Sequence, residues 1–511
     1  MFYRSSTAKR FLLASLAILH ILTAIASPSL VSAADGDVVG CTPDFNISQS
    51  PDNTSADPFL VADPTGLVHL FWAELLPGSA GASNVPDTLM YSVWNGTSWS
   101  TPVDLFLSPP EFFNRRVMGI RAVLDDERVL HLLWQGPDYT LYYSQAPADE
   151  AGNARAWEPE LQLTREEAGA QFSSFIAYEP PSTLHIAYGQ GISNTENRSV
   201  VYIRSTDRGV TWSEPIELIR MAAPGTGPSN VRLLVGQPGD VYASWTEWDM
   251  TGNGQAIYFT RSSDSGLTWA DPIVLDRRQG EEYERDWSTL ALLGENALVA
   301  FWEGGFRAYR QAQYSYDGGA TWTDPIDTLD WLIADNGFAE FARDSAGRLH
   351  LFVLQRVREG NVDKGRREGL WHTMWEGNQQ WREPELVGSQ TPANLVSVAI
   401  SGGNQLFAAT TGTFDYEIHI RRCTIEGAPA IAPQLPVTKA TSPDTDAGTL
   451  PVVEATPPVS SGEPEATLPA IEFSQTPVNE TDPGSPLILG IAAPLFLVAI
   501  TVAGYVLRRR P

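Results

Sequence analysis

The sequence predicts an all-β protein, a β-propeller built from four-stranded blades. Six stretches of the form W-x-x-P, or close to it, recur along the chain, and their tryptophans are 58, 55, 57, 53 and 59 residues apart. Short apolar runs such as VLHLLWQ and VVYIRS accompany each stretch, and no helical period is visible between them. Four short strands in a unit of roughly 55 residues are typical of a propeller blade.

The repeat count predicts seven blades, with six as the alternative. Six complete units run from about residue 57 to residue 388, and a seventh supplies only three strands, at 394–401, 405–410 and 416–423. The missing outer strand of the seventh blade can come from residues 41–48. The two cysteines, Cys41 and Cys423, would then lie on adjacent strands, and we expect a disulfide that closes the ring.

Both ends of the chain lie outside the expected propeller of residues 41–427. Residues 1–34 combine a basic start, an apolar run and small residues, which predicts a secretory signal peptide. Residues 428–486 are rich in Pro, Thr, Ser, Ala and Glu, which predicts a disordered stalk. Residues 487–507 are uncharged and long enough to cross a bilayer, and the basic tail 508–511 follows. We therefore expect an exported protein that a C-terminal helix anchors in the cell membrane, with the propeller outside and the tail in the cytoplasm.

Charge and histidine spacing argue against two classes of partner. The net charge is −27 and the pI is near 4.6, so nucleic acid is not an expected partner of the body. Four histidines occupy equivalent positions in separate units, namely His69, His131, His185 and His350. They should be spread around a ring, whereas a metal ion needs ligands that converge. We predict no metal site and no cofactor.

Three units share a stretch of the form S-x-D-x-G-x-T-W between their third and fourth strands, at 205–212, 262–269 and 315–322. Gly can adopt positive φ at a sharp turn, the Asp carboxylate can accept backbone N–H groups of that turn, and Trp can pack between blades. We predict structural roles for these positions: Ser205, Asp207, Gly209, Trp212, Ser262, Asp264, Gly266, Trp269, Ser315, Asp317, Gly319 and Trp322.

These stretches resemble the Asp boxes, or BNR repeats, of the sialidase and neuraminidase superfamily. The resemblance covers about residues 41–427 and is specific for the repeat type. It implies a ligand pocket on the face opposite the Asp boxes, where loops lead into first strands and join second to third strands; we call this the pocket face. Sialidases have six blades, so the chain resembles an atypical member.

The resemblance also implies a catalytic set, and the sequence lacks part of it. Sialidases use a Tyr nucleophile helped by a Glu, an Asp acid/base, and three Arg that clamp the sugar carboxylate. The first of these Arg lies near the start of the fold, but no Lys or Arg occurs from Phe11 to Asn114. The candidates for catalysis are Tyr416 as the Tyr, Glu247 as its partner, and Asp286. The candidates for ligand binding over the central tunnel are Arg115, Arg116, Tyr283, Arg285, Glu303, Arg307 and Arg310.

Because the first clamp Arg is missing, we expect binding rather than catalysis. The expected function is that of a membrane-anchored, sialidase-like propeller that binds a glycan or a protein ligand on its pocket face. The alternative is an exo-α-sialidase or related glycoside hydrolase with an altered arginine clamp. A second alternative is a scaffold for other envelope proteins.

Overall fold

The structure is a computed structural model, and it describes most of the body of the chain. The described residues are 36–50, 54–75, 86–108, 116–164, 170–190, 198–221, 226–249, 251–280, 283–305, 309–329, 338–355, 369–388, 393–412 and 415–434. Among these residues no helix has the length and apolar character needed to span a bilayer. The expected signal peptide, membrane helix and tail, and all but the first residues of the expected stalk, lie outside them.

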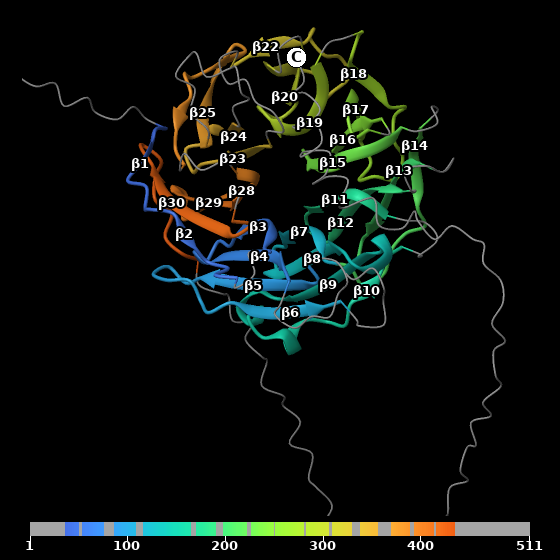
Figure 1. The fold of residues 1–511 in the computed structure, drawn as a ribbon. Helices are drawn as coiled ribbons and strands as arrows, with labels where there is room; N and C mark the ends of the chain where they lie inside the picture. Colours follow the sequence, from blue (N-terminus) through green and yellow to red (C-terminus); the bar gives the residue numbers. More distant parts are fainter. Residues whose placement is uncertain are drawn as a thin grey trace, which may run out of the picture. The chain divides into compact units, whose positions relative to one another are not determined.

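In the described ranges the chain forms seven antiparallel sheets, and Figure 1 shows them arranged as the blades of a ring. The prediction of seven blades is therefore confirmed, and the six-blade alternative is wrong. Each blade begins with its innermost strand and proceeds outward.

The bounds of the strands follow the sequence repeat closely. Blade 1 comprises β3 (Ala56–Ala62), β4 (Val68–Glu74), β5 (Thr88–Trp94) and β6 (Val103–Leu107). Blade 2 comprises β7 (Met118–Leu124), β8 (Val129–Gln135), β9 (Leu141–Pro147) and β10 (Leu161–Gln162). Blade 3 comprises β11 (Ala170–Glu179), β12 (Thr183–Gln190), β13 (Ser199–Ser205) and β14 (Ile216–Arg220). Blade 4 comprises β15 (Gly227–Val235), β16 (Val241–Trp248), β17 (Gly254–Ser262) and β18 (Ile273–Arg277). Blade 5 comprises β19 (Tyr283–Leu292), β20 (Leu298–Gly305), β21 (Tyr309–Ser315) and β22 (Ile326–Thr328).

The last two blades are less regular than the others. Blade 6 comprises β23 (Ala339–Arg343), β24 (Leu349–Gln355), β25 (Gly369–Gly377), β26 (Gln380–Trp381) and β27 (Glu385–Leu386). Blade 7 comprises β28 (Ala393–Ser401), β29 (Gln405–Gly412) and β30 (Ile418–Ile425), with β1 (Val38–Val39) and β2 (Phe45–Asn46) as its outer edge. Three short 3₁₀ helices lie in blade 2, η1 (Pro137–Tyr139), η2 (Ala148–Glu150) and η3 (Ala154–Ala156).

Both chain ends build the seventh blade, as predicted, but the outer strand is not the single run expected at 41–48. It consists of β1 and β2, both paired with β30, and β1 begins before residue 41. Cys41 lies between the two pieces and forms the predicted disulfide with Cys423. The bond therefore fastens the closing strand between two pairings that are each only two residues long.

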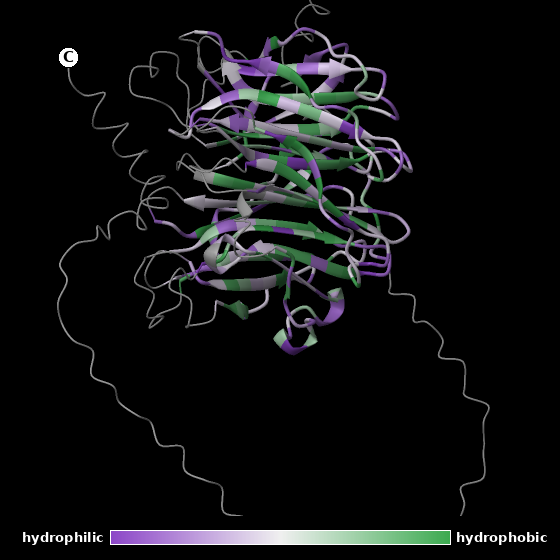
Figure 2. Ribbon diagram, turned by 90° about the vertical axis from the view of Figure 1, so that its right-hand side faces the viewer, coloured by the Kyte–Doolittle hydropathy of each residue, from purple (hydrophilic) through white to green (hydrophobic). Residues whose placement is uncertain are grey.

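The core lies between neighbouring blades rather than inside each sheet. One cluster joins Leu218 of blade 3 to Trp245 of blade 4, and another joins Tyr314 of blade 5 to Leu351 of blade 6. Figure 2 shows hydrophobic residues along the stacked strands and hydrophilic ones at many of the loops. Because each sheet has two faces to cover, a blade is stable only between two neighbours.

The Asp boxes follow β13, β17 and β21, between third and fourth strands as predicted. The backbone N–H of Ser265 donates to the carbonyl of Gly239, in the turn between the first and second strands of the same blade, at 2.8 Å. Asp boxes and these turns therefore share one face of the ring, and the pocket face is the other. The four repeated histidines are buried in four separate blades, and the described residues contain no cluster suited to hold a metal ion.

Candidate functional site

The inner strands carry β-bulges towards their pocket-face ends. The strand registers shift just after Ala56 in β3, Met118 in β7, Ser229 in β15 and Asp286 in β19. At each shift one residue has positive φ, and these are Asp57 (51°), Gly119 (62°), Asn230 (49°) and Trp287 (52°). A bulge bends its strand and redirects the side chains next to it. In each of these blades the bulge therefore turns inner-strand side chains out of the regular alternation, at positions that surround the ring centre.

Trp287 departs from the chemistry of the other bulge residues. Gly, Asn and Asp tolerate the left-handed region, whereas a bulky side chain there is an outlier that costs about 1–3 kcal/mol. Such strain persists only where the surroundings impose it, and it concentrates at functional sites. Trp287 is therefore the strongest local indication of a site.

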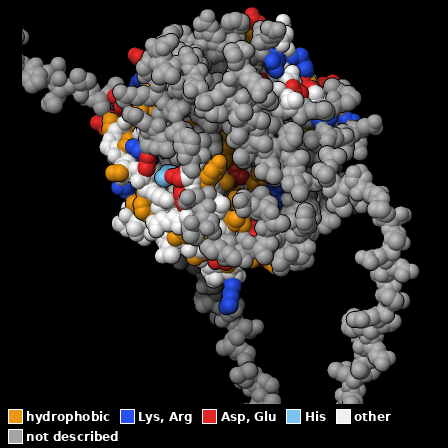
Figure 3. Space-filling model, viewed as in Figure 1, with side chains coloured by type: hydrophobic (Ala, Val, Ile, Leu, Met, Phe, Trp, Pro, Cys, Tyr) orange, Lys and Arg blue, Asp and Glu red, His pale blue; other side chains and the backbone are white. Residues whose placement is uncertain are grey.

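Three partly exposed rings from consecutive blades form what we call the aromatic arc, Trp248, Trp287 and Phe338. The Trp248 and Trp287 ring centroids are 5.6 Å apart with the planes at 86°, and the Trp287 and Phe338 centroids are 4.1 Å apart. Trp248 ends a second strand and Phe338 precedes a first strand, so the arc lies on the pocket face. Figure 3 shows hydrophobic and acidic side chains near the centre of the ring.

A buried carboxyl group lies directly behind the aromatic arc. Asp286 accepts a hydrogen bond from the Trp248 indole N–H at 2.8 Å and one from the Trp287 backbone N–H at 2.9 Å, both at Oδ1. Burial raises the pKa of Asp286 well above its ordinary value, and the nearby Glu284 and Glu303 raise it further. Burial therefore favours the neutral form of this carboxyl group.

Two arginines of the inner strands meet across the ring centre, and we call Arg121 (β7) and Arg232 (β15) the central arginines. Their guanidinium carbons lie 5.8 and 5.4 Å from the ring centroid of Phe175 in β11. Arg121 also lies 5.4 Å from the ring of Phe59 in β3. Because the contacts join blades 1 to 4, these side chains point towards the ring centre rather than into one blade interface.

The central arginines retain unused hydrogen-bond donors. Arg232 pairs with Glu340 of blade 6 at 3.1 Å, and Arg121 donates to the carbonyl of Ile120 at 2.6 Å. The Nε atoms of both arginines are buried and have no hydrogen-bond partner in the described part of the chain. Burial and the neighbouring Arg232 lower the pKa of Arg121 to about 10, while Glu340 and Asp57 act in the opposite direction. The Arg121 guanidinium therefore remains cationic near neutral pH.

Several of the residues predicted from the sequence are brought together in blade 5. Asp286 and Glu303 are opposite each other on β19 and β20, and Glu303 is opposite Arg310 of β21. Arg310 pairs with Glu303 at 3.0 Å and donates to the carbonyl of Leu354 in blade 6, with both charged groups buried. Arg285 pairs instead with Asp276. These ion pairs hold the blade 5 side of the site in place.

The structure does not join Tyr416 to Glu247. The carboxylate of Glu247 accepts a hydrogen bond from Tyr258 at 3.1 Å and pairs with Arg277 at the same distance. Burial raises the pKa of Tyr258, and the adjacent Glu247 raises it further, so the phenol remains protonated. The pair lies on the second and third strands of blade 4, where the Tyr258 ring stacks on Trp245. Tyr416 lies in blade 7, exposed, with φ of 50°.

The remaining predicted ligand residues are divided between described and undescribed segments. Arg116 is buried, with its guanidinium 4.2 Å from the ring centroid of Tyr139 on the pocket face, and its Nε and Nη1 have no partner among the described residues. Arg115 and Arg307 lie outside the described residues, and the side chain of Tyr283 does too.

Sequence reasoning missed the central arginines and the members of the aromatic arc. Arg121, Arg232 and Trp287 lie on first strands, which the repeat marks as structural. A comparison of the bulge position across blades, with Asp57, Gly119 and Asn230 beside Trp287, would have singled out the tryptophan. Nothing in the repeat would have shown that Arg121 and Arg232 share one phenyl ring, because that contact spans blades.

Comparison with known proteins places the ring in a recognised family of repeats. Residues 135–384 match the family described as BNR repeat-like domain. No curated protein sequence matches the chain. The structure of a Hadza microbial sialidase aligns with 14% sequence identity and a TM-score of 0.41. The alignment covers 76% of this chain and 69% of the sialidase chain.

Two further solved structures share this level of similarity. An alpha-L-arabinanase of Penicillium chrysogenum, complexed with arabinobiose, is 12% identical over 64% of this chain and 98% of its own, with a TM-score of 0.44. An ulvan lyase of polysaccharide lyase family 25 is 12% identical over 77% of this chain and 97% of its own, with a TM-score of 0.48. No residue role is carried over from them because the identities and TM-scores are low. The match over residues 135–384, which contain the three Asp boxes, agrees with the resemblance of the chain to sialidase-like β-propellers with BNR repeats.

Proposed function

We propose that the propeller binds a glycan on its pocket face, with a sugar ring stacked on the aromatic arc. The observation that carries the proposal is Trp287, a bulky residue held in the left-handed region where three other blades have Asp, Gly or Asn. Its indole N–H has no acceptor in the described residues, whereas that of Trp248 is used by Asp286. Ligand sites commonly combine aromatic walls with a few placed polar groups, and a sugar presents both an apolar face and hydroxyls.

The central arginines favour an acidic glycan over a neutral one. Guanidinium groups pair well with carboxylates and sulfates, and both Nε donors lack an acceptor. The surrounding protein is strongly acidic, with a net charge of −27, so an anionic ligand depends on local cations such as these. Uronate and sulfate groups supply the same acceptor chemistry, and an experiment can separate them.

The test is calorimetric or array binding with three matched oligosaccharide sets: neutral, uronate-bearing and sulfated. Wild-type protein should bind the acidic sets, and Trp287→Asn should weaken binding about tenfold or more, or about 1.4 kcal/mol. Tyr316→Ala is a matched control, because Tyr316 is an exposed aromatic residue of an Asp box on the opposite face. Unchanged binding by Trp287→Asn would refute the site. If the wild-type protein bound only the neutral set, the proposed site would stand, but the central arginines would have no role in ligand binding.

A glycoside hydrolase is the second candidate, and Asp286 is the observation in its favour. A carboxyl group kept neutral by burial can serve as a general acid for a leaving sugar oxygen. Incubation with fluorogenic sialosides and arabinosides tests this directly. Turnover by wild type that is lost in Asp286→Asn would establish the hydrolase, and binding without turnover would favour the receptor. If the protein showed neither turnover nor binding of a glycan, a scaffold for other envelope proteins would remain as its function.

We also propose that the protein is exported and tethered to the cell membrane, through residues 487–507. Two backbone hydrogen bonds define the face from which the described chain leaves the ring. The backbone N–H of Ile431 donates to the carbonyl of Gly402 and that of Gln434 to the carbonyl of Pro64, both in turns between first and second strands. The chain thus departs from the Asp-box face, so a tether joined there starts on the side opposite the glycan site.

A further inference from the structure

After β30 the chain crosses the Asp-box face of the ring, and we call residues 426–434 the seam strap. β30 ends at Ile425, and the seam strap then contacts turns between first and second strands in blades 6, 7 and 1. These three blades are consecutive around the ring, and the two chain ends meet in blade 7. The seam strap therefore crosses the junction of blade 7 with blade 1, which we call the seam.

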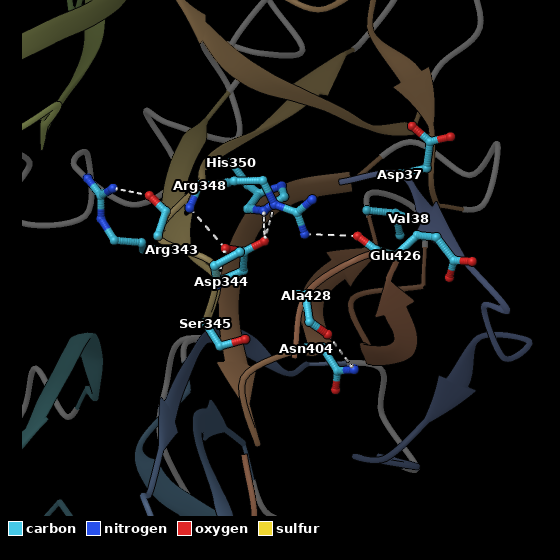
Figure 4. Close-up of polar contacts among 12 residues, drawn as sticks. Asp37, Val38, Arg343, Asp344, Ser345, Arg348, His350, Asn404, Glu426 and Ala428 are labelled. Carbon is cyan, nitrogen blue, oxygen red and sulfur yellow. Dashed lines mark hydrogen bonds and ion pairs between the residues drawn. The ribbon is translucent and has the colours of Figure 1, made fainter. Parts of the chain in front are cut away.

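The seam strap begins at a peptide group that binds both blade 6 and the N-terminal segment. The carbonyl of Glu426 accepts hydrogen bonds from Arg348 Nη2 of blade 6 and from the backbone N–H of Gly36, each at 2.8 Å. The backbone N–H of Glu426 donates to the carbonyl of Asp37 at 2.9 Å. Figure 4 shows Arg348 reaching Glu426, with Asp37 on the neighbouring strand.

The turn of blade 7 holds the middle of the seam strap. Asn404 Nδ2 donates to the carbonyl of Ala428 at 3.2 Å, as Figure 4 shows, and the backbone N–H of Ile431 donates to the carbonyl of Gly402 at 2.8 Å. Ala428 is buried in a core cluster that joins blades 6 and 7, whereas half of the Ile431 side chain is exposed. Beyond Ala428 the seam strap is therefore held mainly by hydrogen bonds.

The two neighbouring blades also bind the seam strap. Ser345 Oγ of blade 6 donates to the carbonyl of Pro429, and the backbone N–H of Gln434 donates to the carbonyl of Pro64 in blade 1 at 2.9 Å. Neither contact involves β1, β2 or the disulfide. The seam strap thus connects blade 7 to blade 1 by a path that is separate from the closing strand.

The seam contains a hydrogen bond that reports whether the junction is closed. The backbone N–H of Leu60 in β3 donates to Ser397 Oγ of β28 in blade 7 at 3.0 Å. Leu60 also belongs, with Trp72 and Phe407, to the core cluster between these two blades. Opening of the seam would expose the Leu60 amide to solvent, and amide exchange measures such openings.

We propose that the seam strap is a second clasp of the ring, which acts in parallel with the closing strand and keeps blade 7 on blade 1 when the Cys41–Cys423 bond is reduced. The contacts of the seam strap are hydrogen bonds, so a thiol reductant does not change them. Two connections in parallel release a junction only when both are lost. The loss of either one should therefore affect the seam little, and the loss of both should affect it strongly.

Gly403 offers a way to displace the seam strap without a change to the closing strand. Its φ is 82°, and a Cβ there would lie 2.6 Å from the carbonyl oxygen of Pro429 and 2.8 Å from Ser345 Oγ. Gly403→Ala should therefore push the seam strap away from the turn of blade 7. Gly252→Ala is the matched control, because Gly252 has φ of 80° in blade 4 with open space around it.

The experiment follows the amide exchange of Leu60 in the full chain, with and without a thiol reductant, in wild type, Gly403→Ala and Gly252→Ala. Reduction alone and Gly403→Ala alone should each raise the exchange rate less than about threefold. Together they should raise it at least about tenfold beyond the product of the two single effects. In Gly252→Ala, reduction should have the same effect as in wild type.

Ser345→Ala makes the test independent of backbone strain, because it removes only the hydrogen bond to Pro429. With reductant it should produce an excess of Leu60 exchange in the same direction as Gly403→Ala, but smaller. In wild type the amides of Ile431 and Gln434 should be protected from exchange. If the effects of reduction and of Gly403→Ala on Leu60 simply multiplied, or if those two amides exchanged as in a free peptide, the proposal would be overturned.

Discussion

At the scale of single residues, the Asp box acts as a turn and a wedge. In the second box, Asp264 Oδ1 accepts hydrogen bonds from Ser262 Oγ at 2.7 Å and from the Thr268 backbone N–H at 2.8 Å. Trp269 packs edge-on against Tyr202 of the preceding blade, with centroids 4.9 Å apart. The box thus closes its own turn and also contacts the neighbouring blade, which is the structural role that the sequence predicted.

Gly266 shows why the box requires glycine. Its φ is 78°, and a Cβ there would overlap with the hydroxyl of Tyr202. Gly266→Ala should therefore lower the free energy of unfolding by about 2–4 kcal/mol, the sum of backbone strain and overpacking. Gly252→Ala is the control, since Gly252 has φ of 80° but open space around it, and it should cost only about 1–2 kcal/mol. Urea denaturation measures both, and equal costs would show that the Tyr202 contact is unimportant.

Asp286 predicts a pH dependence of stability. Because its pKa is raised in the folded state, its contribution is complete below the ordinary carboxyl value and is lost as the pH rises towards the folded value. Asp286→Asn keeps an acceptor for Trp248 and cannot ionise. Relative to wild type it should gain up to about 1.4 kcal/mol per pH unit across that range. Urea denaturation at pH 4.5 and 7 measures the difference, and a pH-independent difference would contradict it.

Asp317 supplies a control of opposite sign for that experiment. Hydrogen bonds from Thr321, with its side chain contributing most, lower the pKa of Asp317 to about 2. Its contribution is present above the ordinary carboxyl value and is lost as the pH falls towards about 2. Asp317→Asn should therefore lose stability relative to wild type at pH 7, with the loss shrinking in acid.

At the scale of elements, the closing strand is the weakest joint of the ring. β1 and β2 each pair with β30 over two residues, whereas β28 and β29 pair over eight. The Cys41–Cys423 disulfide spans 382 residues and bonds the closing strand covalently to its partner. A cross-link across so long a loop restricts the unfolded chain more than one across a short loop.

Removal of this disulfide should destabilise the ring measurably. Reduction of the bond, or the double variant Cys41→Ser with Cys423→Ser, should lower the free energy of unfolding by about 2–5 kcal/mol. Denaturant titration with and without a reducing agent measures the change in wild type. The stability of the double variant should not change with the reducing agent. If the reducing agent left the unfolding midpoint of the wild type unchanged, the disulfide would not stabilise the ring.

The inner strands explain how much of the candidate site could be predicted. Glu303 and Arg310 were found because they flank the sequence between two recognisable strands, β20 and β21, at the pocket-face end. Trp287 and Arg121 were missed because a bulge shifts the register, and a one-residue shift moves a side chain to the other face. Glu247 pairs with Tyr258 instead of Tyr416 because Tyr258 lies on the neighbouring strand of the same blade, whereas Tyr416 lies in blade 7.

At the scale of the whole molecule, the tether predicts where the protein is found. The full chain should fractionate with membranes and expose its propeller to protease added from outside, whereas a chain that ends at residue 434 should be released into the medium. The released propeller should bind the same glycans, because its chain leaves from the Asp-box face. Recovery of the full chain in the soluble cytoplasmic fraction would contradict export and anchoring.

The sequence by itself determined the blade unit, and it predicted seven blades, with six as the alternative, and the pairing of the two cysteines. The blade unit follows from local signals, namely a repeat of fixed length and alternating strands, whereas the resemblance to sialidases implied which face carries the Asp boxes. Only the tertiary structure decided that Arg121 and Arg232 share the ring of Phe175, that Trp287 bears a strained backbone, and that Glu385 of blade 6 accepts the backbone N–H of Val38. The physical reason is that the arginine contacts and the Glu385–Val38 hydrogen bond join different blades, while the Trp287 backbone depends on a bulge that breaks the regular strand pattern.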